Sequence, residues 1–168
     1  GTMPRLSEYG KLLRNKQVLK RMYQMSEKQF SNLVNITSKK YAKNKSQDHD
    51  MVLTQFLNRR LDNVVLRAGF ARTIMQARQM VVHGHFLLNG KKHNVPSYFV
   101  NIGDILTLKP ALQSSALYDL DTKNYQSPVW LSANFTNFEI KVLEFPGETE
   151  TQGLPVDVLK VIEFYARA

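Results

Sequence analysis

The sequence predicts an α+β protein in which helices come first and a small, mostly antiparallel sheet follows. Up to Gly84, apolar residues recur at spacings of three and four, which is typical of amphipathic helices. After Gly84 the spacing shortens to two, and an Asn-Gly pair separates two strand-like runs, which indicates a hairpin. With 168 residues, the chain has the length of one domain or two small ones.

The first fifty residues predict two helices and a linker. Ser7 can cap a helix that runs to Tyr23. The segment Ser26–Gln29 has the capping-box pattern and opens a second helix. The polar stretch Ser38–Asp50 is nearly devoid of large apolar residues, so we predict a linker there.

A strong helical pattern runs from Met51 to Ala68, where Gly69 is suited to a left-handed cap. Thr73–Gln76 then forms another capping-box pattern and opens a short helix that ends near Gly84. The tight joint between the two helices is typical of a helix-turn-helix arrangement. On the first of these helices, the predicted exposed stripe includes Arg59, Arg60, Asn63 and Arg67.

The strands are predicted downstream. Asn89-Gly90 suits a type I′ turn between two strands. Residues 111–127 are weakly patterned, Pro155 suits a helix start, and Val161–Tyr165 suits a final short helix or strand. Further short strands are predicted at Tyr98–Val100 and Ile105–Leu108. Two apolar runs follow, Val129–Leu131 and Phe138–Phe145, and the second alternates as a strand does.

Composition excludes several classes of function. The chain has no cysteine, which removes thiolate catalysis, thiolate zinc sites and disulfides. No apolar run approaches the roughly 20 residues that span a bilayer, so we expect no membrane partner. The net charge is +9, with 13 basic and 4 acidic side chains in residues 1–60 but 4 and 8 in residues 111–168. A basic N-terminal region joined to an acidic C-terminal region favours a polyanionic partner.

One local pattern suits phosphate binding. The helix that begins at Thr73 offers backbone N–H groups and a positive dipole end, and Arg72 lies beside it. Arg78 and Gln79 follow on the next turn, while Lys91 and Lys92 follow the hairpin tip. The competing interpretation is a small domain whose charges are merely solvated, and pattern alone leaves it open.

Metal and enzyme chemistry find little support. His83, His85 and His93 could suggest a metal site, but no Asp or Glu lies between Asp62 and Asp104 to complete it. We therefore predict no metal and no cofactor. No Gly-rich phosphate loop, nucleophile elbow or Ser/His/Asp grouping is present, so we predict no catalytic residues.

A series of motifs runs through the chain in a fixed order. The flanks carry Ser7–Gly10 (SEYG), Lys16-Gln17 (KQ), Arg21–Tyr23 (RMY), Glu27–Phe30 (EKQF), Pro128–Leu131 (PVWL) and Val161–Arg167 (VIEFYAR). The middle carries Arg59–Ala71 (RRLDNVVLRAGFA), Ala77–Gln79 (ARQ), Val82–Gly90 (VHGHFLLNG), Asn94–Tyr98 (NVPSY) and Gly103-Asp104. Together they resemble the small-subunit ribosomal protein S-four family, most weakly in residues 36–50 and 109–153.

This resemblance implies an architecture and a function. A helical domain, residues 1–50 plus 154–168, would carry an inserted α/β RNA-binding module, residues 51–153, with two helices and the sheet. The protein would be a primary rRNA-binding constituent of the bacterial or organellar small subunit. It would nucleate subunit assembly, neighbour ribosomal protein S-five, and contribute to translational accuracy where mRNA enters. The expected location is the ribosome, in the cytoplasm or an organelle.

The family usually carries a further basic segment before the SEYG motif, sometimes with a zinc-binding cysteine cluster. Here only Gly1–Leu6 precedes that motif, so we expect a truncated product or a remnant of cloning. The predicted RNA contacts in the module are Arg60, Asn63, Arg67, Arg72, Thr73, Arg78, Gln79, His83, His85, Asn89, Lys91 and Lys92, and those in the helical domain are Lys11, Arg14, Lys20 and Arg21.

Two other functions stay open at this point. The module also suits an accessory part, or a fragment, of an RNA-modifying or tRNA-charging enzyme, although few residues remain after residue 110 for a catalytic domain. It also suits a stand-alone factor that binds stalled ribosomal particles, although such factors are usually little more than the module.

Overall fold

A computed structural model describes residues 7–167, which divide into two compact units. Within the described residues, the helical unit comprises residues 7–56 and 147–167, and the sheet unit comprises residues 57–146. The α+β class predicted from the sequence is confirmed. The domain limits predicted after residues 50 and 153 stay a prediction, because a compact unit is a geometric division and a domain is one that can fold alone.

Two capped helices begin the helical unit. Helix α1 (Glu8–Met22) starts at Ser7, whose side chain accepts a hydrogen bond from the backbone N–H of Gly10 at 3.0 Å. Helix α2 (Glu27–Lys43) starts at Ser26 with both hydrogen bonds of a capping box to Gln29. Both predicted helix starts are confirmed.

The predicted linker is wrong at both ends, because helix α3 (His49–Arg59) already begins at residue 49 and α2 continues through residues 38–43. Tertiary contacts hold this last turn. The Ser38 hydroxyl lies 3.0 Å from Nε2 of His49, and the Tyr41 ring stacks on the same imidazole with centroids 4.3 Å apart. A polar segment therefore stays helical because His49, at the start of the next helix, packs on it.

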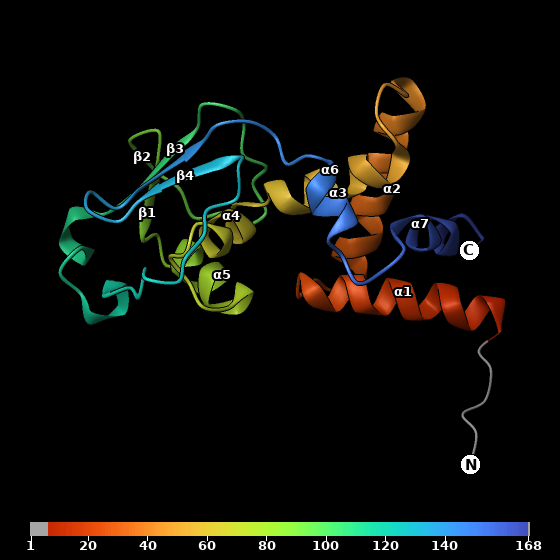
Figure 1. Ribbon diagram of the computed structural model, residues 1–168, viewed down its shortest axis with the longest axis horizontal. Helices are drawn as coiled ribbons and strands as arrows, with labels where there is room; N and C mark the ends of the chain where they lie inside the picture. Colours follow the sequence, from red (N-terminus) through yellow and green to blue (C-terminus); the bar gives the residue numbers. More distant parts are fainter. Residues whose placement is uncertain (1–6, 168) are drawn as a thin grey trace, which may run out of the picture. The chain divides into compact units, whose positions relative to one another are not determined.

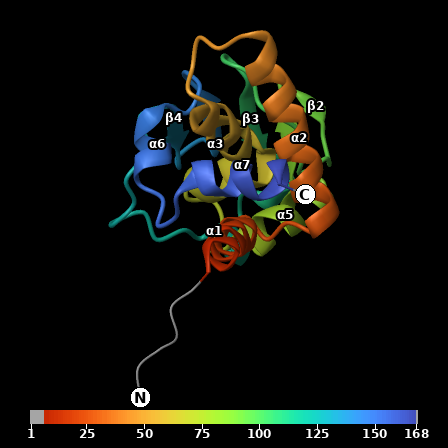
Figure 2. The same ribbon diagram turned by 90° about the vertical axis from the view of Figure 1, so that its right-hand side faces the viewer.

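The C-terminal tail completes the helical unit. After the short helix α6 (Glu148–Gln152), helix α7 (Val158–Ala166) packs against α1 and α2, as Figure 2 shows. Leu12, Leu19 and Phe30 are buried with Val158 and Val161. The Tyr165 hydroxyl also donates to Glu27 Oε1 at 2.9 Å.

The helix predicted from Met51 to Ala68 is wrong at one point, because it is two helices, α3 (His49–Arg59) and α4 (Leu61–Arg67). Arg60 between them has extended backbone, with φ −58° and ψ 139°. The backbone N–H of Leu61 donates to the Tyr98 carbonyl at 2.8 Å, and that of Asp62 donates to the Pro96 carbonyl at 3.1 Å. These bonds replace those of a continuous helix, so a segment nearly forty residues away breaks it.

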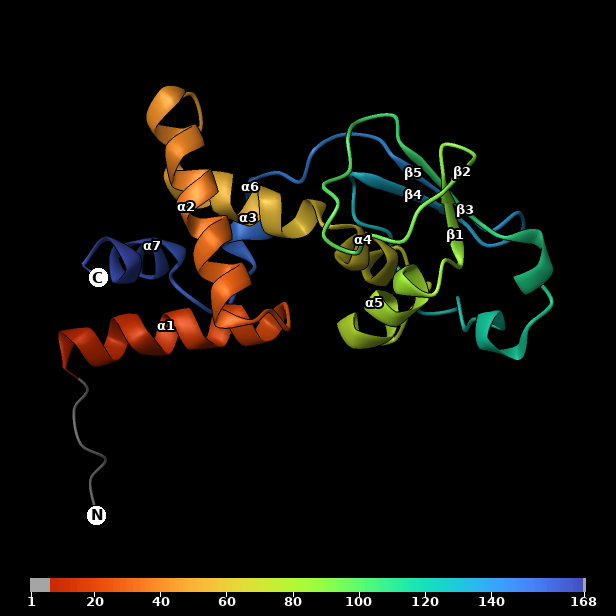
Figure 3. The ribbon, with the colours of Figure 1, turned by 180° about the vertical axis from the view of Figure 1, so that it is seen from behind.

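The sheet unit packs two helices on one face of a five-stranded antiparallel sheet (Figure 1). The strand order is β2-β1-β3-β5-β4, which Figure 3 shows from behind. The largest side chains of the shared core are Phe70, Phe86 and Trp130. The elements are α4, α5 (Ile74–Val82), β1 (Phe86–Leu88), β2 (Lys91–Lys92), β3 (Ile105–Leu108), the 3-10 turns η1 (Pro110–Leu112) and η2 (Ala116–Tyr118), β4 (Leu131–Asn134) and β5 (Glu139–Val142).

The predicted hairpin is confirmed. Asn89 and Gly90 both have positive φ, 51° and 82°, as a type I′ turn requires. Leu88 pairs with Lys91 on either side of that turn. None of the helices in residues 7–167 has the length and apolar character needed to cross a membrane.

Candidate nucleic-acid interface

A buried carboxylate lies at the start of α4. Asp62 is completely buried and accepts hydrogen bonds from Arg60 Nη2 at 3.1 Å and from Arg78 Nε at 3.0 Å. It also accepts one from the backbone N–H of Asn63 at 2.7 Å. A buried charge needs such partners, so Asp62 holds both guanidinium groups against the core.

The predicted exposure of Arg60 and Asn63 is therefore wrong. Arg60 is only 6% exposed, beside Asp62, and Asn63 is 4% exposed. The Asn63 side-chain amide donates to the Asn58 carbonyl at 2.9 Å. The physical reason is the break at Arg60, because the helical spacing that defines an exposed stripe does not carry across it. Both side chains stabilise the fold, and Arg78 is half-buried beside them.

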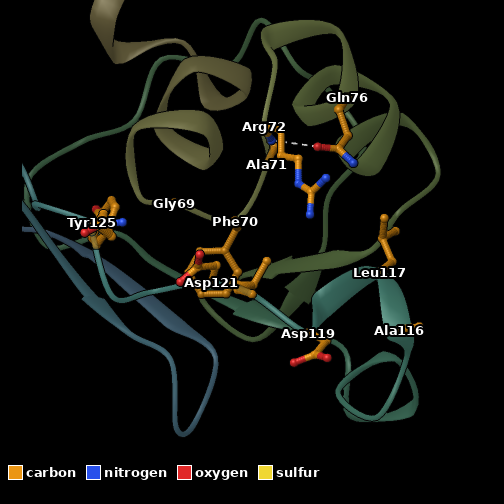
Figure 4. A pocket seen from close by; sticks show the side chains of 12 residues that line it. Gly69, Phe70, Ala71, Arg72, Gln76, Ala116, Leu117, Asp119, Asp121 and Tyr125 are labelled. Carbon is orange, nitrogen blue, oxygen red and sulfur yellow. Dashed lines mark hydrogen bonds between the residues drawn. The ribbon is translucent and has the colours of Figure 1, made fainter.

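The start of α5 leaves one arginine at the surface. Thr73 caps the helix by accepting from the Gln76 backbone N–H at 3.0 Å. The Gln76 side chain accepts from the backbone N–H of Arg72 at 2.6 Å, one residue before the cap. Figure 4 shows this bond and the Arg72 guanidinium beyond it. The exposed Arg72 lines a hollow of about 500 Å³ that Asp119 and Asp121 also line.

The remaining predicted residues of the two helices differ in exposure. Gln79 is exposed on α5, whereas Arg67 is half-buried near the end of α4. The Arg67 carbonyl accepts a hydrogen bond from the Tyr125 hydroxyl at 2.8 Å. Gln79 therefore presents a polar group to solvent, whereas Arg67 is only partly accessible.

Of the predicted residues in the hairpin, Asn89 supports the turn, whereas Lys91 and Lys92 lie at the surface. The Asn89 side chain donates to Asp104 Oδ1 at 3.0 Å and accepts from the Ile105 backbone N–H at 2.9 Å, so it holds the turn. Lys91 and Lys92 are exposed on β2, which is an edge strand of the sheet. The two lysines therefore expose the positive charge of the hairpin to solvent.

The histidines lie close together but do not form a metal centre. The rings of His83 and His85 are 6.2 Å apart, and Nδ1 of His85 lies 2.8 Å from the Tyr118 hydroxyl. Burial, then the nearby charges of His83 and Lys109, lower the pKa of His85. Within residues 7–167, no group of three or more His, Asp or Glu side chains is placed to hold a metal ion.

A second cavity, which we name the basic hollow, lies at the end of α5. Its volume is about 270 Å³. The RNA contacts predicted from the sequence do not include Lys109, His93 or Asn94, and nothing in the local sequence brings Lys109 to His83. Lys109 comes close to His83 because β1 pairs with β3 and the pairing continues with a hydrogen bond from the Lys109 N–H to the His85 carbonyl at 2.9 Å. The lining residues are Val82, His83, Gly84, Lys92, His93, Asn94 and Lys109.

In the helical unit, Glu27 engages part of the predicted basic set. Lys16, which is 5% exposed, forms an ion pair with Glu27, and Lys20 lies 3.4 Å from the same carboxylate. Burial of Glu27 acts to raise its pKa, but hydrogen bonds with Lys16 and Tyr165 outweigh it, so the pKa is lowered. Lys20 is therefore partly neutralised within the fold.

The other three predicted residues of this unit are exposed. Lys11 forms a solvent-exposed pair with Glu8 at 3.3 Å, and such pairs contribute little. Arg14 and Arg21 are exposed as well. Lys11 and Arg14 line a cavity of about 420 Å³ with Asn15 and the 155–156 segment. This part of α1 can contact a polyanion.

Family comparisons define the class of protein. Residues 59–106 match the S4 domain, and residues 1–58 match the Ribosomal protein S4/S9 N-terminal domain. The chain is therefore a ribosomal-type protein with an S4 RNA-binding domain. Relatives that are 40–44% identical to it over 97–99% of its length show that it belongs to the family of small ribosomal subunit protein uS4.

Three relatives carry that printed name. The relative from Persephonella marina is 44% identical over 170 residues, which cover 99% of this chain and 80% of the relative. The relative from Aquifex aeolicus is 40% identical over 172 residues, covering 99% and 79%. The relative from Thermotoga maritima is 40% identical over 166 residues, covering 97% and 77%.

Proposed function

We propose that this chain is a structural constituent of the small ribosomal subunit that binds rRNA through basic surfaces on both units. Its role is binding, not catalysis. Family membership supports the ribosomal role, and the distribution of charge in the sheet unit supports rRNA as the ligand.

One observation carries the proposal. Residues 61–110 contain only two carboxylates, Asp62 and Asp104, and these are 0% and 8% exposed. Asp104 accepts from the Asn101 backbone N–H at 2.8 Å, so it too is used inside the fold. The same segment carries six basic side chains, and three of them, Arg72, Lys91 and Lys92, are exposed. The exposed charges of this segment itself are therefore positive and its own acids are buried, which suits contact with a phosphate backbone. Beside Arg72, Asp119 and Asp121 of the following segment also line the hollow.

Binding by two units would raise the overall affinity. Arg14 and Arg21 on α1 are exposed, and Lys11 adds to them. When two linked units bind one RNA, the second contact forms at a high effective concentration. We therefore infer that the helical unit extends the contact made by the sheet unit.

The family resemblance supports finer roles within the same proposal. We infer that the chain binds rRNA early and nucleates assembly, neighbours ribosomal protein S-five, and contributes to accuracy where mRNA enters. In stepwise reconstitution, omitting the chain should prevent later proteins from joining. Unimpaired assembly without it would contradict the nucleating role.

A matched-charge titration tests the proposal. The triple variant Arg72→Gln, Lys91→Gln, Lys92→Gln removes three charges from the segment. The control Lys123→Gln, Lys141→Gln, Lys160→Gln removes three from elsewhere. In filter binding to a small-subunit rRNA transcript at increasing salt, we expect the first to lower the slope of log K against log salt by about two to three and the control to leave it nearly unchanged. Equal losses, or salt-independent binding by the unmodified chain, would contradict it.

A further inference from the structure

The basic hollow brings together side chains from three separate segments. His83 comes from the end of α5, Lys92 and His93 from the end of β2, and Lys109 follows β3. Nothing in the order of these residues along the chain predicts that they line one cavity of about 270 Å³. A cavity of that volume can hold a phosphate group with several waters, since each water takes about 30 Å³.

The chemistry of the lining suits one kind of ligand. Two lysines, two histidines and an asparagine line the hollow, and none of its lining residues is acidic. Neither Lys92 nor Lys109 forms an ion pair within the described part of the chain, residues 7–167. Two ammonium groups that share a cavity without a carboxylate repel each other, so an anion between them is stabilised.

Neighbouring groups constrain two of these side chains, Lys109 and His93. A Cβ added to Gly84 would lie 3.6 Å from Lys109 Nζ, so the ammonium group already lies over Gly84. The His93 ring packs edge-on against Tyr98 with centroids 4.9 Å apart, and its Nε2 lies 3.2 Å from the Val95 carbonyl. A site whose side chains are already held loses less entropy when it binds.

We propose that the basic hollow binds a single backbone phosphate of the bound RNA, which Lys92 and Lys109 contact jointly. This rests on the proposed rRNA binding and assigns one contact within it. Lys91 provides the matched comparison, because it is the neighbouring exposed lysine on the same strand but does not line the hollow.

The test is a double-mutant cycle on RNA affinity. We expect Lys92→Gln and Lys109→Gln each to weaken binding of a small-subunit rRNA transcript by about tenfold, as loss of a hydrogen bond between charged groups does. The double variant should lose clearly less than the hundredfold product, because both lysines hold one phosphate. Lys91→Gln should weaken binding by a factor severalfold smaller than either Lys92→Gln or Lys109→Gln does. Unchanged thermal melting of each variant would show that the fold is intact.

Phosphorothioate interference supplies a second readout. One position in the transcript should weaken binding of the unmodified chain when modified, and the Lys92→Gln and Lys109→Gln variants should be insensitive there. Equal losses for Lys91→Gln and Lys92→Gln, or a fully multiplicative double variant, would overturn the shared phosphate while leaving rRNA binding intact. Failure of the unmodified chain to bind rRNA would instead overturn the proposed function.

Discussion

Asp62 decides where two arginine charges go. Its carboxylate draws Arg60 and Arg78 against the core, whereas Arg72 lies exposed a few residues away. The residues are of one type and close in sequence, so identity and spacing cannot tell them apart. What separates them is distance to a buried carboxylate: Arg60 lies two residues from Asp62 at the helix break, whereas Arg78 reaches Asp62 only when α4 and α5 pack together.

Replacing Asp62 therefore tests the fold more than the RNA surface. Asp62→Asn leaves Arg60 buried without a counter-charge, and we expect the free energy of unfolding to fall by about 3–5 kcal/mol. Urea denaturation measures this. Asp121→Asn, at an exposed position, is the control and should change it by under about 0.5 kcal/mol. A loss no larger than the control's would show that Asp62 does not hold the two arginines.

At the scale of elements, the break between α3 and α4 matters most. The N–H groups of Leu61 and Asp62 donate to residues 96–98, so the loop before β3 fixes where α4 begins. That start sets which face of α4 meets the sheet. An apolar pattern along one segment cannot report a partner nearly forty residues away, and for this reason the single predicted helix was wrong.

Gly69, which follows α4, and Gly103, which lies just before β3, form a matched pair of glycines with positive φ. Gly69 has φ +87°, and a Cβ there would lie 2.8 Å from Tyr125 Cδ2. Gly103 has φ +90° and open space around it. Gly103→Ala should lower the free energy of unfolding by about 1–2 kcal/mol through backbone strain alone. Gly69→Ala should lose more, because the Tyr125 ring must also move. Equal losses in denaturant titrations would rule out the steric contribution.

At the scale of the whole molecule, each unit contains a histidine whose pKa is lowered by burial. Burial lowers the pKa of His49 in the helical unit, with Asp50 opposing. Burial also lowers the pKa of His85 in the sheet unit. In both cases the unfolded chain, with a pKa near 6.5, binds the proton more readily than the folded chain. The free energy of unfolding therefore rises with pH until the pH reaches the pKa of the unfolded chain. That gain is lost as the pH falls from that value toward the lower pKa of the folded chain.

Thermal melting between pH 5.5 and 7.5 tests this linkage. We expect the unmodified chain to melt at a higher temperature at pH 7.5, and the difference to shrink in His49→Gln and in His85→Gln. His83→Gln, at an exposed position, should shrink it only slightly, because the charge of His83 lowers the pKa of His85 less than burial does. A pH dependence that survives in the double variant His49→Gln, His85→Gln would assign it to other groups.

Local chemistry alone determined the helix starts at Ser7, Ser26 and Thr73, the Asn89-Gly90 turn and the excess of positive charge, because capping, turn geometry and composition depend on neighbours in sequence. Only the tertiary structure decided which cations reach solvent. Asp62 removes Arg60 from the surface, and strand pairing brings Lys109 to His83. The physical reason is that ion pairs and cavities depend on distances in space, which the packing of remote segments sets.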